Sequence, residues 1–240
     1  MSHSFSPIKR SPAYQKVYDA IEADILSGRL PKDAVLPTEG ELAGQFGVHR
    51  STVREGMRLL EQAGLIRRGA AKRMAVARLE AEETAERASR SLALHGVTFL
   101  EVWEALAMFQ PEAARLAATR LGEDALDELE VAVAIVGAAE DADGVVAGAV
   151  SFFQHVARAL DNRAVLVMLQ SLNMLIETSL LRVIDVLPGA AARIATAQAE
   201  MVAAFRARDG EAAALWMRRH IDDLKRGYEV AGVALNEQVL

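Results

Sequence analysis

The 240-residue chain contains no cysteine, which excludes disulfide bonds and thiolate metal sites. It also contains no run of about 18 uncharged apolar residues, so the sequence predicts no membrane span. Residues Met1 to Arg10 lack the apolar stretch of a signal peptide. We therefore expect a cytoplasmic protein with no membrane partner.

The composition and the distribution of charge predict two domains with different partners. The chain is 52% hydrophobic and 25% charged, enough to bury a core, and its length suits two domains. Residues 1–78 hold 13 Lys and Arg against 8 Asp and Glu, whereas residues 79–240 hold 14 against 25. Because the N-terminal part is basic and the remainder is acidic, we expect only the N-terminal part to contact phosphate groups.

Residues 12–78 carry start and stop signals for helices and a wing. Ser11-Pro12 is typical of an N-cap followed by proline at the first helical position, and that helix should end near Ser27-Gly28. Thr38 and Glu41 have the spacing of a capping box that opens another helix. Short apolar pieces around basic residues 67–73 suit a two-stranded wing.

The helices predicted at 38–46 and 50–62 are joined by a turn of only three residues. Ala43 is small where two helices cross, Gly47 allows a positive φ in the turn, and Val53 faces inward. This combination favours a helix-turn-helix over a generic helical hairpin.

The second of these helices has the side chains of a DNA-reading helix. Arg50 and Arg54 lie one turn apart and can each bond to a guanine, while Ser51 and Thr52 can reach phosphates or base edges. The alternative is an arginine face that is simply solvated. The other predicted DNA contacts are Thr38, His49, Arg58, Arg67, Arg68 and Lys72.

The remainder of the chain has a helical pattern with breaks near Gly96, Gly122 and residues 141–144, 161–162, 188–189 and 209–210. We expect a linker helix over 79–96 and an antiparallel bundle of six to seven helices over 97–233. Residues 1–11 are expected to be a flexible lead and residues 234–240 a tail. The predicted fold class is mainly α, with a winged helix-turn-helix before the bundle.

Residues 12–77 resemble the winged helix-turn-helix of the GntR family of transcription regulators. The matching stretches are Ile25–Leu30, Leu36–Glu39, Phe46–Glu55 and Gly64–Ile66. The resemblance implies operator contacts from the recognition helix and the wing tip. Gly40 and Ala71 depart from the family pattern, which commonly has an arginine and a glycine at these positions.

The C-terminal region resembles the ligand-binding domain of the FadR subfamily over about residues 95–232. Matching stretches are Gln110–Ala118, Phe152–Asn162 and Trp216–His220. Many members hold a divalent metal through one Asp and three His residues. Those four positions fall here on Ser151, His155, Gln198 and His220.

Because only His155 and His220 of that set remain as ligands, we expect no cofactor, and a zinc or nickel site is disfavoured. Leu106 and Gln110 also replace charged residues of the family pocket, and Trp103 is a further candidate for its lining or for the core. The resemblance then implies a neutral, lipophilic or acyl-CoA-like effector. Both histidines can also be read as hydrogen-bonded core residues.

The sequence thus predicts a sequence-specific regulator, a nucleoid-associated homodimeric repressor that binds palindromic operator DNA and a small-molecule effector. One alternative is an effector-independent regulator with a vestigial pocket. The other is a helical enzyme, but the pair Ser151 and His155 lacks the third acid of a catalytic set.

Overall fold

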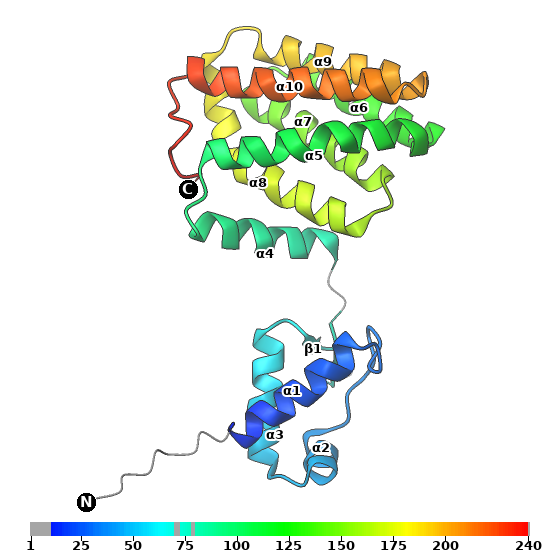
Figure 1. The fold of residues 1–240 in the computed structure, drawn as a ribbon, viewed down its shortest axis with the longest axis vertical. Helices are drawn as coiled ribbons and strands as arrows, with labels where there is room; N and C mark the ends of the chain where they lie inside the picture. The colour runs from blue at the N-terminus through cyan, green and yellow to red at the C-terminus, as the bar shows by residue number, and fades with distance from the viewer. Residues whose placement is uncertain (1–10, 70–72, 78–79, 240) are drawn as a thin grey trace, which may run out of the picture. The chain divides into compact units, whose positions relative to one another are not determined.

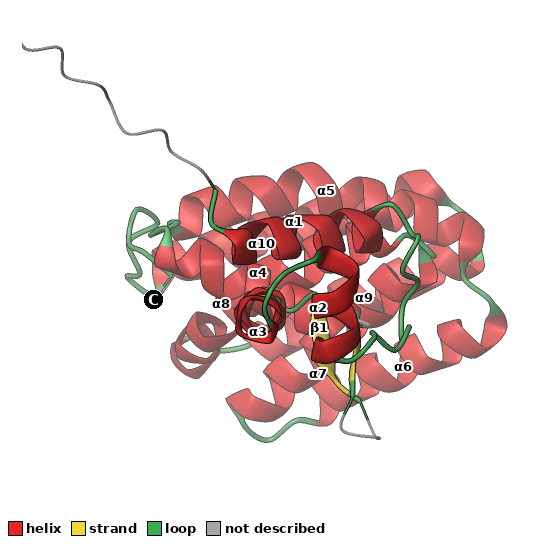
Figure 2. Cartoon of the chain, turned by 90° about the horizontal axis from the view of Figure 1, so that it is seen from below, coloured by secondary structure: helices red, strands yellow, loops and turns green. Residues whose placement is uncertain are grey.

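The computed structural model describes residues 11–69, 73–77 and 80–239. The chain forms two compact units that divide between residues 79 and 80 (Figure 1). Helices dominate both, and the two strands lie in the N-terminal unit (Figure 2). The predicted fold class, mainly α with a two-stranded wing, is confirmed.

The N-terminal unit has three helices followed by a hairpin. Its elements are α1 (Ala13–Leu26), α2 (Glu39–Phe46), α3 (Arg50–Gln62), β1 (Ile66–Arg68) and β2 (Met74–Val76). The predicted start of the first helix is wrong by one residue: Pro12, not Ser11, is the N-cap, and no side chain caps this helix. Pro12 is extended (ψ 149°) and its carbonyl accepts from Gln15 and Lys16, so the turn begins after the proline.

Local signals set the ends of α2 as predicted. Thr38 and Glu41 form the capping box: Thr38 N donates to the Glu41 carboxylate at 2.7 Å, and Glu41 N donates to Thr38 Oγ1 at 3.3 Å. Gly47 ends the helix with φ 63°, a conformation that other residues adopt at a cost. The short turn that follows delivers the chain to α3.

Small and aliphatic side chains hold these three helices together. Val53 is fully buried and Ala43 is nearly so, as the helix-turn-helix pattern requires. Gly56 on α3 lies against α1, because a β-carbon there would come within 3.0 Å of the Tyr14 carbonyl and a Val17 methyl. The contact surface fixes α1 across α3.

The wing is an antiparallel pair in which Ile66 is opposite Val76. Val35 forms a bridge with Ala75, so the segment before α2 extends the hairpin on one side. Both Val76 and Ile66 are buried, which attaches the wing to the helical core. The predicted contact Lys72 lies outside the described residues.

The C-terminal unit is a bundle whose helices are separated at the predicted breaks. They are α4 (Ala81–Leu94), α5 (Phe99–Arg120), α6 (Glu123–Ala138), α7 (Ala142–Ala159), α8 (Arg163–Val186), α9 (Ala190–Arg206) and α10 (Gly210–Val230). Helix α10 lies along α5 and α9, α6 packs on α7 and α9, and α8 packs on α4 and α7 (Figure 1).

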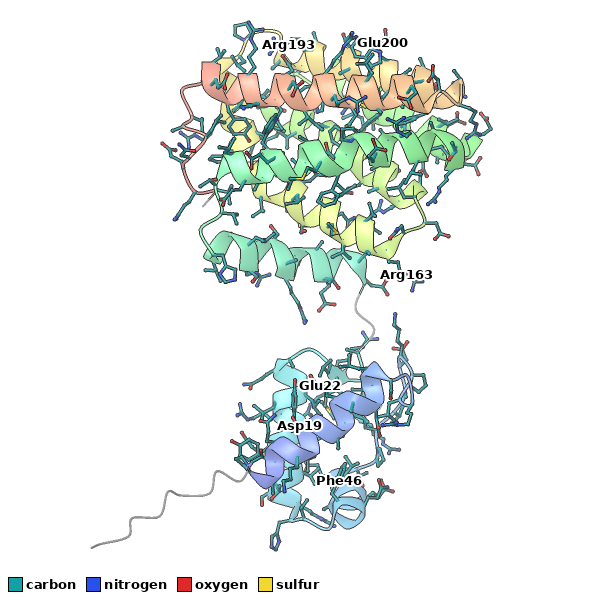
Figure 3. All side chains as sticks on the ribbon, viewed as in Figure 1. Asp19, Glu22, Phe46, Arg163, Arg193 and Glu200 are labelled. Carbon is teal, nitrogen blue, oxygen red and sulfur yellow. The ribbon has the colours of Figure 1, made fainter. Side chains whose placement is uncertain are left out.

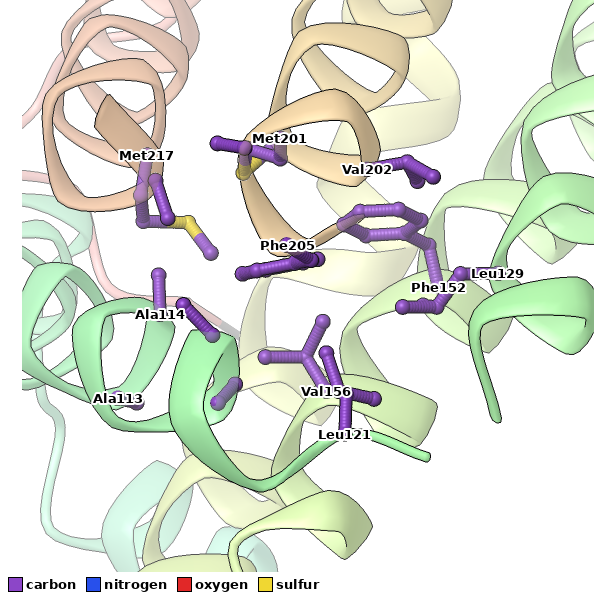
Figure 4. Packing of buried hydrophobic residues seen from close by; sticks show 14 of the residues in the cluster. Ala113, Ala114, Leu121, Leu129, Phe152, Val156, Met201, Val202, Phe205 and Met217 are labelled. Carbon is purple, nitrogen blue, oxygen red and sulfur yellow. The ribbon is translucent and has the colours of Figure 1, made fainter. Parts of the chain in front are cut away.

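Aromatic and sulfur-containing side chains meet small ones in the core of this bundle. Phe152 and Phe205 are fully buried beside Met201, and Ala114 on α5 gives them room (Figure 4). At Gly148, a β-carbon would lie 2.7 Å from a Val136 methyl, so α6 and α7 approach closely. The alanine-rich sequence thus reflects close helix packing.

The segment predicted as a tail crosses the start of α5. Val239 N donates to the Val97 carbonyl at 3.0 Å, and Phe99 N and Leu100 N donate to carbonyls of the same segment. The side chain of Val239 packs with Ala93 of α4 and with Leu106 of α5 in one apolar cluster. We call the described residues 234–239 the C-terminal strap.

Among the described residues, no single helix has both the length and the apolar composition needed to cross a membrane. Only the two arms of α8, Arg163–Glu177 and Ser179–Val186, meet those criteria when combined, and they are bent by 53°.

Candidate functional site

The N-terminal half of α3 presents the predicted DNA-contacting side chains to solvent. His49 is the N-cap residue, and Arg50, Ser51 and Arg54 are exposed, with Thr52 half-buried. The opposite face of α3 is buried in the core of the N-terminal unit, so the helix that carries these side chains is rigid.

Arg54 is held by a carboxylate from the start of α2. Its Nε donates to both Glu39 oxygens at 3.1 Å, and its Nη2 donates to Oε2 at 2.8 Å. These hydrogen bonds lower the pKa of Glu39 below its usual value. The pair fixes the direction of the guanidinium and leaves Nη1 for another acceptor. Glu39 is not among the DNA-contacting residues predicted from the sequence, because its position directly after the capping threonine does not indicate a pairing with Arg54.

Other basic residues border a groove beside this pair. The groove, about 460 Å³, runs between α3, the start of α2 and the wing, and Arg54, Arg58, Arg68 and Arg73 line it. Arg73 donates to the Leu36 carbonyl at 3.0 Å. Two predicted contacts form surface ion pairs, Arg58 with Glu55 and Arg67 with Asp33.

The C-terminal unit contains a largely apolar cavity of about 60 Å³ between α5, α7, α8, α9 and α10. Three predicted pocket residues, Leu106, Gln110 and His220, line it. Aliphatic side chains of α8, of its C-cap residue and of α9 form much of the remaining wall: Ile176, Leu180, Val183, Ile184, Leu187 and Ile194. The substitution of Leu106 for a charged family residue contributes to this apolar character.

A few polar groups face the cavity. Gln110 Nε2 donates to Asn173 Oδ1 at 3.0 Å, and Arg193 Nε donates to Asp223 at 3.0 Å. The His220 ring lies 5.1 Å from the Phe153 ring, and burial lowers the pKa of His220 to about 4. His220 is therefore uncharged at neutral pH.

The other predicted pocket residues lie elsewhere in the bundle. His155 contacts the Ser151 carbonyl through Nδ1 at 2.7 Å and lies 3.3 Å from the Glu128 carboxylate. Trp103 donates to the Ile221 carbonyl at 2.9 Å, with Lys225 over its ring. Their bonding agrees with the alternative reading of satisfied structural side chains.

Gln198 is fully buried, and its amide oxygen and nitrogen have no hydrogen-bond partner among the described residues. Within those residues no group of three or more His, Cys, Asp and Glu side chains is placed to hold a metal ion. Of the four residues that the resemblance assigns to the family metal set, Ser151, His155, Gln198 and His220, the cavity lining includes His220 alone.

Both units match known protein families. The model described as bacterial regulatory proteins, gntR family, matches residues 13–76, and the FCD domain model matches residues 101–223. The first match covers the three helices and the wing, and the second covers α5 to α9 and most of α10.

Two relatives from Mycobacterium tuberculosis are similar to the chain. An uncharacterized HTH-type transcriptional regulator is 32% identical over 170 residues, which is 68% of both chains. The HTH-type transcriptional regulator Mce2R is 36% identical over 63 residues, and the chain covers only 26% of its length. A solved structure, Streptococcus agalactiae GntR, aligns over 89% of this chain and 99% of that one, with a TM-score of 0.64 and 23% identity.

Proposed function

The chain belongs to the gntR family of bacterial regulatory proteins and carries an FCD domain, and we propose that it regulates transcription by binding specific operator DNA. The observation that carries this proposal is the exposed start of α3, where Arg50 and Arg54 project from a helix whose opposite face is buried. Such a helix start enters a major groove and reads base edges.

The residues around this helix start have separate roles in the proposal. Arg50 and Arg54 contact base edges, and Ser51 and Thr52 contact phosphates or bases. Backbone N–H groups at the start of α3 add phosphate contacts, since the N-cap His49 makes no side-chain cap there. Thr38, Arg58, Arg67, Arg68 and Lys72 are proposed as further contacts with the DNA backbone.

We infer a homodimer on a palindromic operator. A single α3 contributes only about three or four base-reading side chains, so two copies are needed for tight and specific binding. The helical unit is then the effector-binding part, with the cavity lined by Leu106, Gln110 and His220 as the binding site. An effector acts by favouring one of two arrangements of the dimer.

The proposal is tested by selecting duplexes from a random pool with the full chain and measuring affinity for the recovered sequence. Arg50→Ala should weaken binding by about 1–3 kcal/mol. Arg163→Ala is the matched control, because Arg163 is an exposed arginine at the start of α8 (Figure 3) and its loss changes net charge equally. Recovery of no sequence would contradict the DNA-binding proposal, and equal operator affinities of the two variants would contradict the base contact assigned to Arg50.

Repression is the predicted outcome of operator binding. A reporter whose promoter overlaps the selected sequence should be less active when the protein is present. An increase in reporter activity would assign activation instead.

A further inference from the structure

The cavity lining has more acidic than basic residues, and this difference limits the chemical class of ligand that can bind. Its lining includes two acidic residues, Glu177 and Asp223, and the basic residue Arg193. Arg193 is paired with Asp223 at 3.0 Å and also donates to the Pro188 carbonyl at 3.4 Å. Its positive charge is therefore already balanced by the protein.

Glu177 has no such counterpart. Within the described part of the chain, no hydrogen bond or ion pair involves its carboxylate, although it is half-buried on the cavity wall. The cavity lining thus has one uncompensated negative charge, at Glu177.

Neighbouring groups add acceptors close to this carboxylate. Asn173 lies one helical turn before Glu177 on α8. The side chain of Gln110, on α5, donates a hydrogen bond to Asn173. That bond uses Gln110 Nε2 and leaves the Gln110 carbonyl oxygen as an acceptor. The polar strip Gln110, Asn173 and Glu177 is surrounded by aliphatic side chains.

From this arrangement we propose that the cavity binds a small lipophilic amine, with its ammonium group on the Glu177 carboxylate and its hydrocarbon part against the aliphatic wall. The inference rests on the proposed function, in which this cavity is the effector site, and it narrows the expected effector. A carboxylate ligand is disfavoured, because its negative charge meets the like charge of Glu177 at a half-buried position. An ammonium group gains charge-assisted hydrogen bonds there.

The size of the cavity limits the ligand. A volume of about 60 Å³ has room for a few water molecules, so only a small and narrow ligand enters without rearrangement of the wall. Longer chains require the aliphatic side chains of the wall to rotate. An unbranched six-carbon chain is narrow and flexible, which makes it a suitable test ligand.

The experiment follows the thermal unfolding of the full chain against rising concentrations of hexylamine, hexanol and hexanoate at equal ionic strength. Hexylamine should bind about tenfold more tightly than hexanol, which is the scale of one charge-assisted hydrogen bond, and hexanoate should bind least. Comparing the three ligands within one variant removes any effect of the variant on stability itself.

Two variants separate the cavity carboxylate from general charge. Glu177→Gln should abolish the preference for hexylamine over hexanol. Glu200→Gln removes the same charge from an exposed site on α9 (Figure 3) and should keep the preference. An unchanged preference in Glu177→Gln, or equal binding of hexylamine and hexanoate by the unmodified chain, would overturn the amine assignment.

Binding of the selected operator, measured on the same preparations, separates this inference from the proposed function. If the chain binds DNA but does not bind hexylamine more tightly than hexanol, the ligand class is wrong and the regulator assignment stands. If hexylamine binds through Glu177 but no DNA sequence is recovered, the amine site stands and the DNA-binding proposal fails.

Discussion

The guanidinium group of Arg50 lies against Gly40, in the space that a side chain at residue 40 would need. A β-carbon at Gly40 would lie 2.9 Å from Arg50 Nη2 and 3.2 Å from its Cζ. The residue at the start of α2 that departs from the family pattern thus makes room for the first arginine of α3. We infer that Gly40 sets the direction in which Arg50 projects.

Gly40→Ala should displace the Arg50 side chain from its direction and so weaken operator binding by about 1 kcal/mol. The fold should remain intact, because the added methyl group meets only the flexible tip of the arginine. Gly44→Ala, in the same helix, meets no atom within 4 Å and is the matched control. Both variants should gain a little helix stability. Equal operator affinities in a gel-shift titration would show that Gly40 does not position Arg50.

His220 should make stability depend on pH. Burial lowers its pKa from 6.5 to about 4, opposed by Asp223. Above pH 6.5 the imidazole is neutral in both the folded and the unfolded chain. Between pH 6.5 and about 4 the unfolded chain takes up a proton and the folded chain does not. The free energy of unfolding therefore decreases as the pH is lowered through this range.

His220→Gln should remove this part of the pH dependence, about 1–3 kcal/mol between pH 7 and about pH 4. Urea unfolding at several pH values measures it. His95→Gln, at an exposed histidine after α4, should leave the pH dependence as it is. A His220→Gln profile parallel to that of the unmodified chain would contradict the burial of a neutral imidazole.

The C-terminal strap should stabilise the bundle through Val239. This side chain packs against the apolar cluster that includes Ala93 and Leu106, so Val239→Ser should lower the free energy of unfolding by about 1–2 kcal/mol. Hydrogen exchange should also speed up at α4 amides. Glu237→Ser, an exposed position in the same strap, is the control and should change neither measurement. No difference between the two variants would mean that the strap is not a packing element.

Tyr228 should contribute through its hydroxyl group. The hydroxyl lies 2.6 Å from Ser179 Oγ in a buried position, and burial raises the pKa of Tyr228 to about 12. Tyr228→Phe should cost about 1 kcal/mol of unfolding free energy. A double-mutant cycle with Ser179→Ala measures the coupling between the hydroxyls. Additive effects would show that this hydrogen bond does not stabilise the fold.

Much of the fold followed from signals within a few residues. The capping box at Thr38, the turn at Gly47 and the glycine and proline breaks between the bundle helices act locally, so their positions could be predicted. At Ser11 the local signal misled, because a proline that is extended serves as N-cap itself.

The candidate sites depend more on contacts between distant residues. The pairing of Arg54 with Glu39 joins residues from two helices, and no spacing rule reveals it. Leu106, Gln110 and His220 meet at one cavity, whereas Gln198 and His155 do not reach it, although all five were chosen from the same family pattern. Side-chain direction and helix packing decide which of them face the space.

The amino-acid sequence by itself determined the order of the helices, the wing and the character of the α3 start, because caps, breaks and apolar spacing act within one or two turns. Only the tertiary structure decided that Glu177 lies beside an apolar cavity with no partner among the described residues, and that the strap lies across α5. These features arise where helices far apart in the chain pack together, and their energies depend on that packing.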